Sequence, residues 1–503
     1  MPLTPRAVRT APRRPGALPA LLLAALLLAL QLLSPAAAAA HTRLRSAAPA
    51  PGSTVADTVS EIRLSFTRPV VPEMTSLVLT TGAATVAQGK LRAVEGAGGM
   101  VFVFPLPRKL AAGPYTAVWH SAAADGHVIH GNFTFTVSAG EGEAPPLTVV
   151  AAGVTQVVDT STAAPAAAFQ ATPADAPDGD VPADPGAEEV DHETSEFDAV
   201  APLPLAVRWL QFVALLAMIG AVAFNLLVVR RLGSKLPERV ADRAAYGAWY
   251  LAAGAAALGL LTLVVRLWLQ SRAIFGPEQA FDGEQLDALL TGTVWGSGWI
   301  LQAIATVAYF VGLMVARAPH GRSIGWMGAA FASLLLAAVP ALSGHASSTE
   351  RFTALAIITD WLHVLGAGVW LGTLASVLLA GLPASAFVGE GQGTAAFATL
   401  VRGFSPVALA GAGTAGATGV VSSLFHLTSI SNLWGTWYGR MLVLKLALLG
   451  VVVLLGYVNW RRILPVADTP EGTRRLRRNA TAELANGVVV ILVTAALVAL
   501  PTP

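Results

Sequence analysis

Eight long apolar stretches constrain the fold of this chain more than any other feature of its sequence. Each is near the roughly 20 residues that an α-helix needs to cross the hydrocarbon core of a bilayer, although the last is marginal in length. The chain is 54% hydrophobic and 12% charged, which is too apolar for a soluble protein of 503 residues. We therefore predict an all-α polytopic membrane domain of eight transmembrane helices within residues 203–503. The stretches lie at about 203–229, 245–270, 295–317, 324–343, 353–380, 404–425, 439–461 and 484–500.

Basic residues indicate which ends of these helices face the cytoplasm, because cytoplasmic loops carry an excess of Lys and Arg. The connections between them are neutral or acidic, as around Glu278 and Asp282. We therefore predict a multi-pass protein of the plasma membrane with its N-terminal domain and its C-terminus on the outer, or periplasmic, side. The basic residues follow the first, third and seventh stretches: Arg230, Arg231, Lys235, Arg239 and Arg243; Arg317 and Arg322; Arg461, Arg462, Arg474, Arg475, Arg477 and Arg478.

Residues 1–40 have the organisation of a cleavable signal peptide, which agrees with an outer N-terminus. Four arginines precede an apolar run, and five alanines at 36–40 supply the small residues of a cleavage site. Cleavage after Ala40 makes His41 the first residue of the mature protein. Its free α-amine and its imidazole can then occupy adjacent corners of a square plane around Cu(II), which favours tetragonal nitrogen and oxygen donors.

Residues 41–138 have the alternation of a small all-β domain. Ile62, Leu64 and Phe66 alternate with polar residues, and Gly and Pro turn signals separate the short strands. About a hundred residues of this kind predict an exported β-sandwich. The following segment, 139–202, is predicted to be an acidic disordered linker, because positions 141–200 hold 13 of the 30 acidic residues and no Lys or Arg.

Several histidines lie near the end of the predicted sandwich. Asp125 and His127 are two residues apart at a turn signal, so that an extended backbone or a tight turn brings both toward one ion. With the His41 amine and imidazole they supply three nitrogens and one carboxylate oxygen, a set that suits Cu(II) better than Zn, Ca or Mg. His120 and His130 are additional candidate ligands. The chain has no Cys, which excludes disulfides and thiolate metal sites.

Motifs throughout the predicted sandwich are typical of a known family. They are the segment from His41 to Gly52, Leu64-Ser-Phe66, the segment from Pro114 to Trp119, Asp125-Gly-His127, and the segment from Gly131 to Val137. With them the domain resembles the CopC family of periplasmic copper-binding proteins. The resemblance implies an immunoglobulin-like, cupredoxin-related sandwich that binds Cu(II) through the mature N-terminal histidine, an Asp and a His. By motif position these ligands are His41, Asp125 and His127.

The chain departs from this family pattern in two places. Members often carry an acidic residue before a Pro-Val pair, whereas this chain has Thr67-Arg68-Pro69-Val70. Some members have a Met-rich loop that binds Cu(I), whereas the mature domain contains only Met74 and Met100. The first difference argues against an auxiliary carboxylate ligand at that place, and the second favours a site for Cu(II) alone.

Ionisable residues within the membrane part indicate a second functional region. Asp360 and His363 are three residues apart, and Trp370 is seven beyond His363, so all three share roughly one helix face. An ionisable pair inside a span is costly and is by default a functional hypothesis. In the predicted topology, His345 and His426 lie at the outer ends of their helices, and Asp360 and His363 lie one to three turns below. The four residues thus describe a descending copper path.

A structural interpretation of the same residues remains open, in which Asp360 pairs with Lys445 or Arg440 to hold the helices together. The membrane part also resembles the CopD family, which is known to occur fused to CopC. This second resemblance spans about residues 203–500, and Glu483 is expected ahead of the eighth helix. Its motifs are Ser343-Gly-His345-Ala, Asp360-Trp-Leu-His363, Trp370-Leu-Gly372, Arg402-Gly-Phe-Ser405, Gly439-Arg440, Lys445, Asn459 and Glu483.

Together these features predict a membrane copper protein that is not an enzyme. The exported sandwich captures Cu(II) and passes it to the membrane domain for copper uptake, homeostasis and tolerance. The predicted partners are copper and the lipid bilayer, and nucleic-acid binding has no support. Two other functions are alternatives: a haem-binding membrane electron-transfer protein, which needs paired histidines at similar depth, and a copper oxidase that uses the N-terminal histidine.

Overall fold

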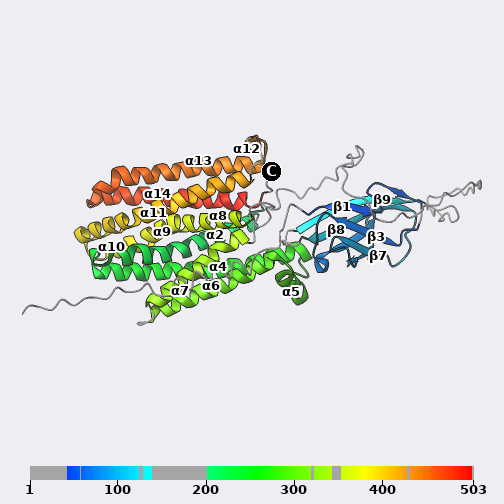
Figure 1. Ribbon diagram of the computed structural model, residues 1–503, viewed down its shortest axis with the longest axis horizontal. Coiled ribbons are helices and arrows are strands. Elements are labelled where there is room, and N and C mark those ends of the chain that lie inside the picture. Colours follow the sequence, from blue (N-terminus) through cyan, green and yellow to red (C-terminus); the bar gives the residue numbers. More distant parts are fainter. Residues whose placement is uncertain are drawn as a thin grey trace, which may run out of the picture.

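The computed structural model contains a β-sandwich and a helical bundle, which lie end to end along the long axis of the molecule (Figure 1). The structure describes residues 42–56, 58–123, 128–138, 201–318, 322–342, 353–426 and 431–500. The predicted signal peptide, 1–40, and residues 139–200 of the predicted linker lie outside the described residues.

Two sheets form the sandwich, which confirms the predicted all-β domain. The strand order is β1-β3-β7-β6 in one sheet and β2-β9-β8-β4-β5 in the other. Strand β2 runs parallel to β9, and the other paired strands are antiparallel. A single 3₁₀ turn, η1, joins the sheets between β3 and β4. The elements are β1 (Leu44–Ala48), β2 (Thr54–Val55), β3 (Glu61–Phe66), η1 (Pro72–Met74), β4 (Ser76–Thr81), β5 (Ala84–Lys90), β6 (Arg92–Ala93), β7 (Val101–Pro105), β8 (Gly113–Ala122) and β9 (Val128–Val137).

The sandwich core follows the alternation that the sequence predicts. Alternate side chains of β3, including Leu64 and Phe66, are at most 1% exposed, because they point between the sheets. The Trp119 ring of β8 meets the Phe66 ring edge to face, with centroids 5.4 Å apart. Gly131 of β9 lies opposite Trp119, and a Cβ at this position would lie 2.8 Å from Trp119 Cζ2. A glycine is therefore required where the Trp119 indole lies against β9.

Among the described residues, eight helices are long and apolar enough to cross a membrane, as predicted. Several contain π-helical or 3₁₀ segments. They are α2 (Pro202–Ala223) with η3 (Phe224–Val229), α3 (Arg230–Leu232) and η4 (Gly233–Lys235); α4 (Glu238–Phe275); α6 (Val294–Arg317); α7 (Arg322–Leu342); α8 (Thr353–Ala367) with η6 (Gly368–Gly372), α9 (Thr373–Ser376), η7 (Val377–Gly381) and α10 (Leu382–Ala386); α11 (Glu390–His426); α13 (Trp437–Val458) with η8 (Asn459–Ile463) and η9 (Leu464–Val466); and α14 (Pro470–Leu497).

Several helices begin well ahead of the predicted apolar stretches, as α14 does most clearly. The eighth helix, α14, begins at Pro470, because the Thr469 hydroxyl caps it by accepting the Gly472 N–H at 3.0 Å. The arginines predicted to lie in the connection at 474–478 therefore lie on the helix, and Glu483 is inside the helix rather than ahead of it. Two short helices, α5 (Gly283–Gly292) and α12 (Asn432–Gly435), lie at the sandwich end of the bundle (Figure 1).

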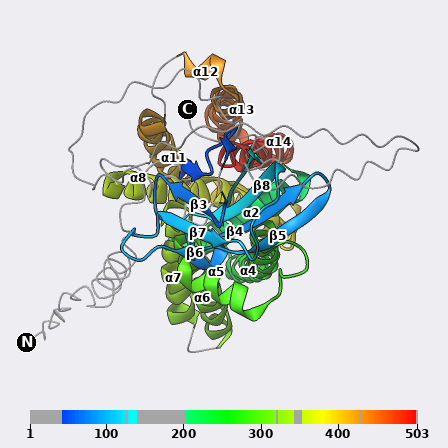
Figure 2. The same ribbon diagram turned by 90° about the vertical axis from the view of Figure 1, so that its right-hand side faces the viewer.

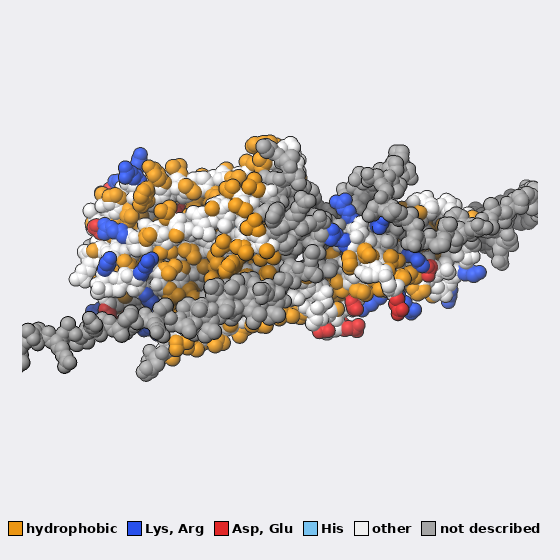
Figure 3. Space-filling view, viewed as in Figure 1, with side chains coloured by type: hydrophobic (Ala, Val, Ile, Leu, Met, Phe, Trp, Pro, Cys, Tyr) orange, Lys and Arg blue, Asp and Glu red, His pale blue; other side chains and the backbone are white. Residues whose placement is uncertain are grey.

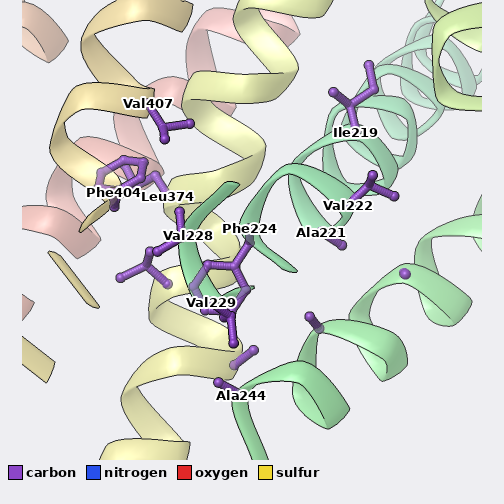
Figure 4. Packing of buried hydrophobic residues seen from close by; sticks show 14 of the residues in the cluster. Ile219, Ala221, Val222, Phe224, Val228, Val229, Ala244, Leu374, Phe404 and Val407 are labelled. Atoms are coloured by element: carbon purple, nitrogen blue, oxygen red, sulfur yellow. The ribbon is translucent and has the colours of Figure 1, made fainter. Parts of the chain in front are cut away.

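Small residues allow the helices of the bundle to pack closely. Gly220 of α2 and Gly372 of η6 lie backbone to backbone, and a Cβ on either residue would overlap the main chain of the other helix. Ala244, Ala248 and Ala252 of α4 are fully buried at the same interface region. Figure 4 shows larger side chains, such as Phe224, filling the space between these helices.

The two ends of the bundle differ in charge. Lys and Arg side chains gather at the end away from the sandwich, and the flank between the ends is mostly hydrophobic (Figure 3). Helix α14 ends near the sandwich (Figure 1). This is the charge distribution from which the sequence predicts an outer sandwich and a cytoplasmic basic end.

The sandwich contacts the bundle through η1 and the end of β8, which we call the docking contact. Val71, Met74 and Ala122 share one buried cluster with Ile274 of α4 and Leu289 of α5. As a result Ala122, at the last position of β8, has no exposed surface. Viewed from the sandwich side, α4 and α5 lie directly behind the strands (Figure 2). The end of the β8–β9 hairpin therefore lies against the bundle.

Candidate metal centre

The three predicted Cu(II) ligands, His41, Asp125 and His127, lie outside the described residues. The strands that precede and follow Asp125 and His127 in the chain are described, and Ala122 of β8 pairs with Val128 of β9. The segment that contains Asp125 and His127 therefore connects β8 to β9 at the end of the hairpin that takes part in the docking contact.

The described backbone that follows His41 lies at the same end of the sandwich. The Arg43 carbonyl accepts a hydrogen bond from Thr67 N at 2.9 Å. Three residues after Thr67, Val70 forms an isolated bridge with Ala123, the last described residue before Asp125. Arg43 and the end of β8 are therefore joined through one short segment, from Thr67 to Val70.

His120 and His130 face each other across β8 and β9, two residue pairs from the end of the hairpin. Their rings are stacked, with centroids 5.8 Å apart and an interplanar angle of 27°. His120 is half-buried and His130 is exposed. Burial, and next the nearby charge of His130, lower the pKa of His120 below its usual value. The His120 imidazole is therefore mostly neutral at pH 7, which is the form that binds metals.

In the bundle, Asp360 and His363 of α8 both contact α11. The Ser422 hydroxyl donates to Asp360 Oδ1 at 3.0 Å. His363 Nδ1 lies 2.9 Å from the Ala415 carbonyl oxygen, and the Thr418 hydroxyl lies 3.3 Å from the same nitrogen. Because a carbonyl only accepts hydrogen bonds, Nδ1 carries the proton and Nε2 keeps its lone pair. A metal-binding histidine is commonly oriented by such a bond from its other nitrogen.

The structural interpretation of Asp360 receives partial support. Lys445 of α13 interacts electrostatically with both Asp360 and His363. Arg440 instead donates its Nε–H to the Trp434 carbonyl at 3.0 Å. The Asp360 region is thus a polar group of three helices, α8, α11 and α13, that includes one basic residue.

The two remaining residues of the predicted membrane path are less fully described. His345 lies outside the described residues, between α7 and α8. His426 is the last residue of α11, and only its backbone is described. Helix α11 passes Thr418 and Ser422 before it ends at His426, so His426 follows these two residues along the helix.

A third polar group, around Glu483, was not assigned a role from the sequence. Asn459 Nδ2 donates to Glu483 Oε2 at 3.1 Å, and the Trp370 side chain also forms a hydrogen bond with Glu483. All three residues are at most 8% exposed. The sequence does indicate this residue, because Glu483 is the residue just before an apolar stretch. The predicted eighth helix begins at residue 484, however, so Glu483 is left outside the span. Together with apolar side chains, these residues line a cavity of about 580 Å³.

Comparison with known families assigns most of the chain. Residues 44–138 match the family described as CopC domain. Residues 199–354 match the N-terminal domain of the copper resistance protein D-like family, and residues 398–497 match the family described as copper resistance protein D. The matches follow the order sandwich, first half of the bundle, second half of the bundle.

Individual proteins are also similar to parts of this chain. The copper transport protein CutJ of Bacillus subtilis (strain 168) is 25% identical over 470 residues, which cover 92% of this chain and 75% of that protein. CopC from Methylosinus trichosporium OB3b is 24% identical and covers 21% of this chain and all of its own, with a TM-score of 0.20. PcoC, a methionine-rich copper resistance protein from Escherichia coli, is 30% identical over 20% of this chain and all of its own, with a TM-score of 0.18.

Proposed function

We propose that this chain, which joins a CopC domain to a copper resistance protein D membrane domain, captures Cu(II) outside the plasma membrane and passes it inward through its helical bundle. The observation that carries the proposal is the docking contact. The end of β8, which leads to Asp125 and His127, lies against α4 and α5, at the end of the bundle opposite to the one where Lys and Arg gather. A captured ion is then held beside the bundle rather than released into bulk solution.

The capture site consists of His41, Asp125 and His127. After cleavage behind Ala40, His41 contributes two nitrogens, and the other residues contribute an imidazole and a carboxylate. This is a nitrogen and oxygen set of the kind that Cu(II) prefers. Support comes from the hydrogen bond between Arg43 and Thr67 and the bridge between Val70 and Ala123, which bring the two segments to one end of the sandwich. His120 and His130 form an auxiliary pair next to it.

In the membrane domain, His345, His426, Asp360 and His363 form the outer half of the copper path. The His363 Nε2 lone pair and the Asp360 carboxylate are its described donors. At 1.5 Å per residue, Asp360 and His363 lie about 10 and 15 Å along α8 from Thr353. Two donors at successive depths allow an ion to exchange ligands as it descends.

Copper uptake is the proposed direction, and it rests on the predicted topology. The sandwich and the C-terminus are on the outer side, and the basic end of the bundle is cytoplasmic. Copper that leaves the capture site therefore enters the membrane domain from outside, and the function is copper uptake and homeostasis, with tolerance as the physiological outcome.

The capture site is tested with full-length processed protein, by Cu(II) titration and electron paramagnetic resonance. His127→Ala, or one residue added ahead of His41, should remove the tight Cu(II) signal, because each takes away an imidazole or the free amine. His320→Ala, in the connection after the third stretch, is the matched histidine control. Unchanged Cu(II) affinity in both altered proteins would contradict the site.

The membrane path is tested by measuring copper accumulation in cells that express equal amounts of each variant. His345→Ala and His363→Ala should both reduce accumulation, because each removes a ligand from the proposed path. Asn486→Leu removes an intramembrane polar side chain that instead donates to the Leu448 carbonyl, and it should leave accumulation unchanged. Wild-type accumulation in both histidine variants would refute the path while leaving Cu(II) capture intact.

A further inference from the structure

Glu483 is a buried carboxyl group that the proposed copper path does not use. It is 5% exposed and lies on α14, about 21 Å from Leu497 at 1.5 Å per residue. Since half of the hydrocarbon core is about 15 Å thick, Glu483 belongs to the inner half of the membrane in the proposed topology. Ionisable residues at such depth are costly, face the interior of a bundle, and mark ion pathways and proton relays.

Two other helices hold the carboxyl group in position. Asn459 donates to Glu483 Oε2 at 3.1 Å, and Trp370, whose indole N–H can only donate, forms a second hydrogen bond with Glu483. Asn459 is the first residue of η8, and Trp370 lies within η6. π-Helical segments are rare and occur frequently at functional sites. Here two of them present their polar side chains to one carboxyl group.

The amide of Asn459 can serve both protonation states of this carboxyl group. Asn459 is 8% exposed, and its Oδ1 has no hydrogen-bond partner among the described residues. A buried acceptor without a partner destabilises the structure. When Glu483 is ionised, Nδ2 donates to it. When Glu483 carries a proton, a half-turn of the amide lets Oδ1 accept the carboxyl O–H, so that Asn459 keeps one hydrogen bond to Glu483 in either state.

Within the described chain, the elements packed against α14 bring no cation to Glu483. None of η6, α9, η7 and η9 contains an ionisable residue. Five ionisable groups of the other elements have other partners. Arg208 donates to the Ala495 carbonyl, Arg402 pairs with Asp468, Lys445 interacts with Asp360 and His363, Arg440 donates to Trp434, and Arg475 pairs with Glu471. The remaining groups are exposed or lie near helix ends: Tyr457, Arg461 and Arg462; Arg474, Arg477 and Arg478 toward the basic end of α14; and Glu390, His426 and Tyr438 near the ends of α11 and α13.

A polar pocket lies close to Glu483 at the basic end of the bundle. It has a volume of about 670 Å³ and is lined by four arginines and by Asn479. Asn479 lies one helical turn before Glu483 on α14, a rise of about 6 Å at 1.5 Å per residue. The carboxyl group is therefore near a water-accessible pocket on the cytoplasmic side, which can supply or accept a proton.

We propose that Glu483 takes up and releases one proton as copper passes through the membrane domain, with Asn459 as its partner in both states. The link to copper rests on the proposed function. The carboxyl group loses its proton to the cytoplasmic pocket, and the resulting carboxylate lowers the electrostatic cost of a passing copper cation. After the cation leaves, the carboxylate takes up a proton that enters from the outside along the copper path, so that each cycle releases one proton on the cytoplasmic side. No electron is transferred in this cycle.

Infrared spectroscopy of the full-length protein in liposomes tests the exchange itself. The difference between acid and alkaline spectra should contain a protonated-carboxyl C=O band that disappears in Glu483→Gln. Asn459→Leu should move the frequency of this band, because it removes the partner of the O–H group. Asn486→Leu, on the same helix but bound to the Leu448 carbonyl, should leave the band unchanged. Identical difference spectra in the wild type and Glu483→Gln would overturn the proposal.

The link to copper is tested with a pH-sensitive dye trapped in the same liposomes. Cu(II) added outside should change the internal pH with the wild-type protein, and the change should fall at least fivefold with Glu483→Gln. An equal pH change in both proteins during copper entry would overturn the proposal. If the wild type admits no copper, the proposed transport is wrong, and the infrared band alone decides whether Glu483 exchanges protons.

Discussion

A disulfide between Val71→Cys on the sandwich and Gly292→Cys on the bundle should form in nearly all molecules. A Cβ built on Gly292 lies 3.8 Å from Val71 Cγ1, and the two residues belong to opposite sides of the docking contact. Disulfides join Cβ atoms about 3.5–4.5 Å apart, and because Val71 Cβ is one bond from Cγ1, a small backbone adjustment brings the two Cβ atoms into this range. The chain has no Cys of its own, so the two introduced thiols can react only with each other within one molecule.

The expected magnitude follows from comparing the docked sandwich with a tethered one. A coil the length of residues 139–201 has an r.m.s. extent of about 44 Å, taking about 5.5 Å times the square root of its length. A sandwich held only by such a coil would present any exposed thiol at millimolar effective concentration, whichever residue carries it. In the docked structure, a thiol at position 71 can form a disulfide with the thiol at position 292, whereas a thiol at the far end of the sandwich cannot reach it. We expect at least tenfold more disulfide than with the control pair Ala83→Cys and Gly292→Cys, because Ala83 lies in the β4–β5 turn, remote from the bundle.

The assay uses membranes treated with a copper-free oxidant such as dipyridyl disulfide, because copper catalysts would load the capture site. The disulfide is quantified by mass spectrometry of peptides before and after reduction. Equal yields from the two pairs would mean that the sandwich has no fixed position on the bundle, and the docking argument for copper transfer would then fail.

Three further outcomes are expected. Gly372→Ala should reduce the thermal stability of the detergent-solubilised protein, because its Cβ would overlap the backbone of α2, whereas Gly413→Ala, which has nothing within 4 Å, should not; equal melting temperatures would contradict the close packing. Gly131→Ala should destabilise the sandwich by roughly 1–3 kcal/mol through overlap with Trp119, and thermal unfolding that matches the wild type would show that Trp119 moves aside. His120 should titrate by NMR below 6.5, and His130→Ala should raise its midpoint only part of the way back, because burial, the larger cause, remains; a full return would make the His130 charge the dominant cause.

The sequence allowed most of the fold to be predicted, because burial has a visible period. Residues 62, 64 and 66 alternate because one face of β3 is buried, and each spanning helix contains its own apolar window. Both predicted family resemblances are confirmed by the family matches. Helix ends were harder to predict. Helix α14 extends 14 residues ahead of the predicted start, since a Thr cap and an Arg-rich turn stabilise helix without adding hydropathy.

The docking contact could not be predicted from the sequence. Val71, Met74 and Ala122 are ordinary apolar residues in a strand-rich domain, and their partners belong to the short helix α5 and the end of α4. The contact depends on two surfaces that are separated by more than a hundred residues of chain, and neither surface has a period of its own. His120 and His130 were identified as candidates, but their stacking depends on the β8–β9 register, which the sequence pattern alone did not fix.

The π-helical segments change how the membrane path must be drawn. In an uninterrupted helix Asp360, His363 and Trp370 share one face, as predicted. The π-helical segment η6, which contains Trp370, holds one extra residue in its turn. This extra residue rotates the side chains that follow it by about 100° relative to those that precede it. Accordingly His363 bonds to Ala415 of α11, whereas Trp370 bonds to Glu483 of α14. Because Trp370 also lies against Gly411 of α11, α11 borders both groups, and an ion that uses both must move from the His363 level of α11 toward α14 between His363 and Trp370.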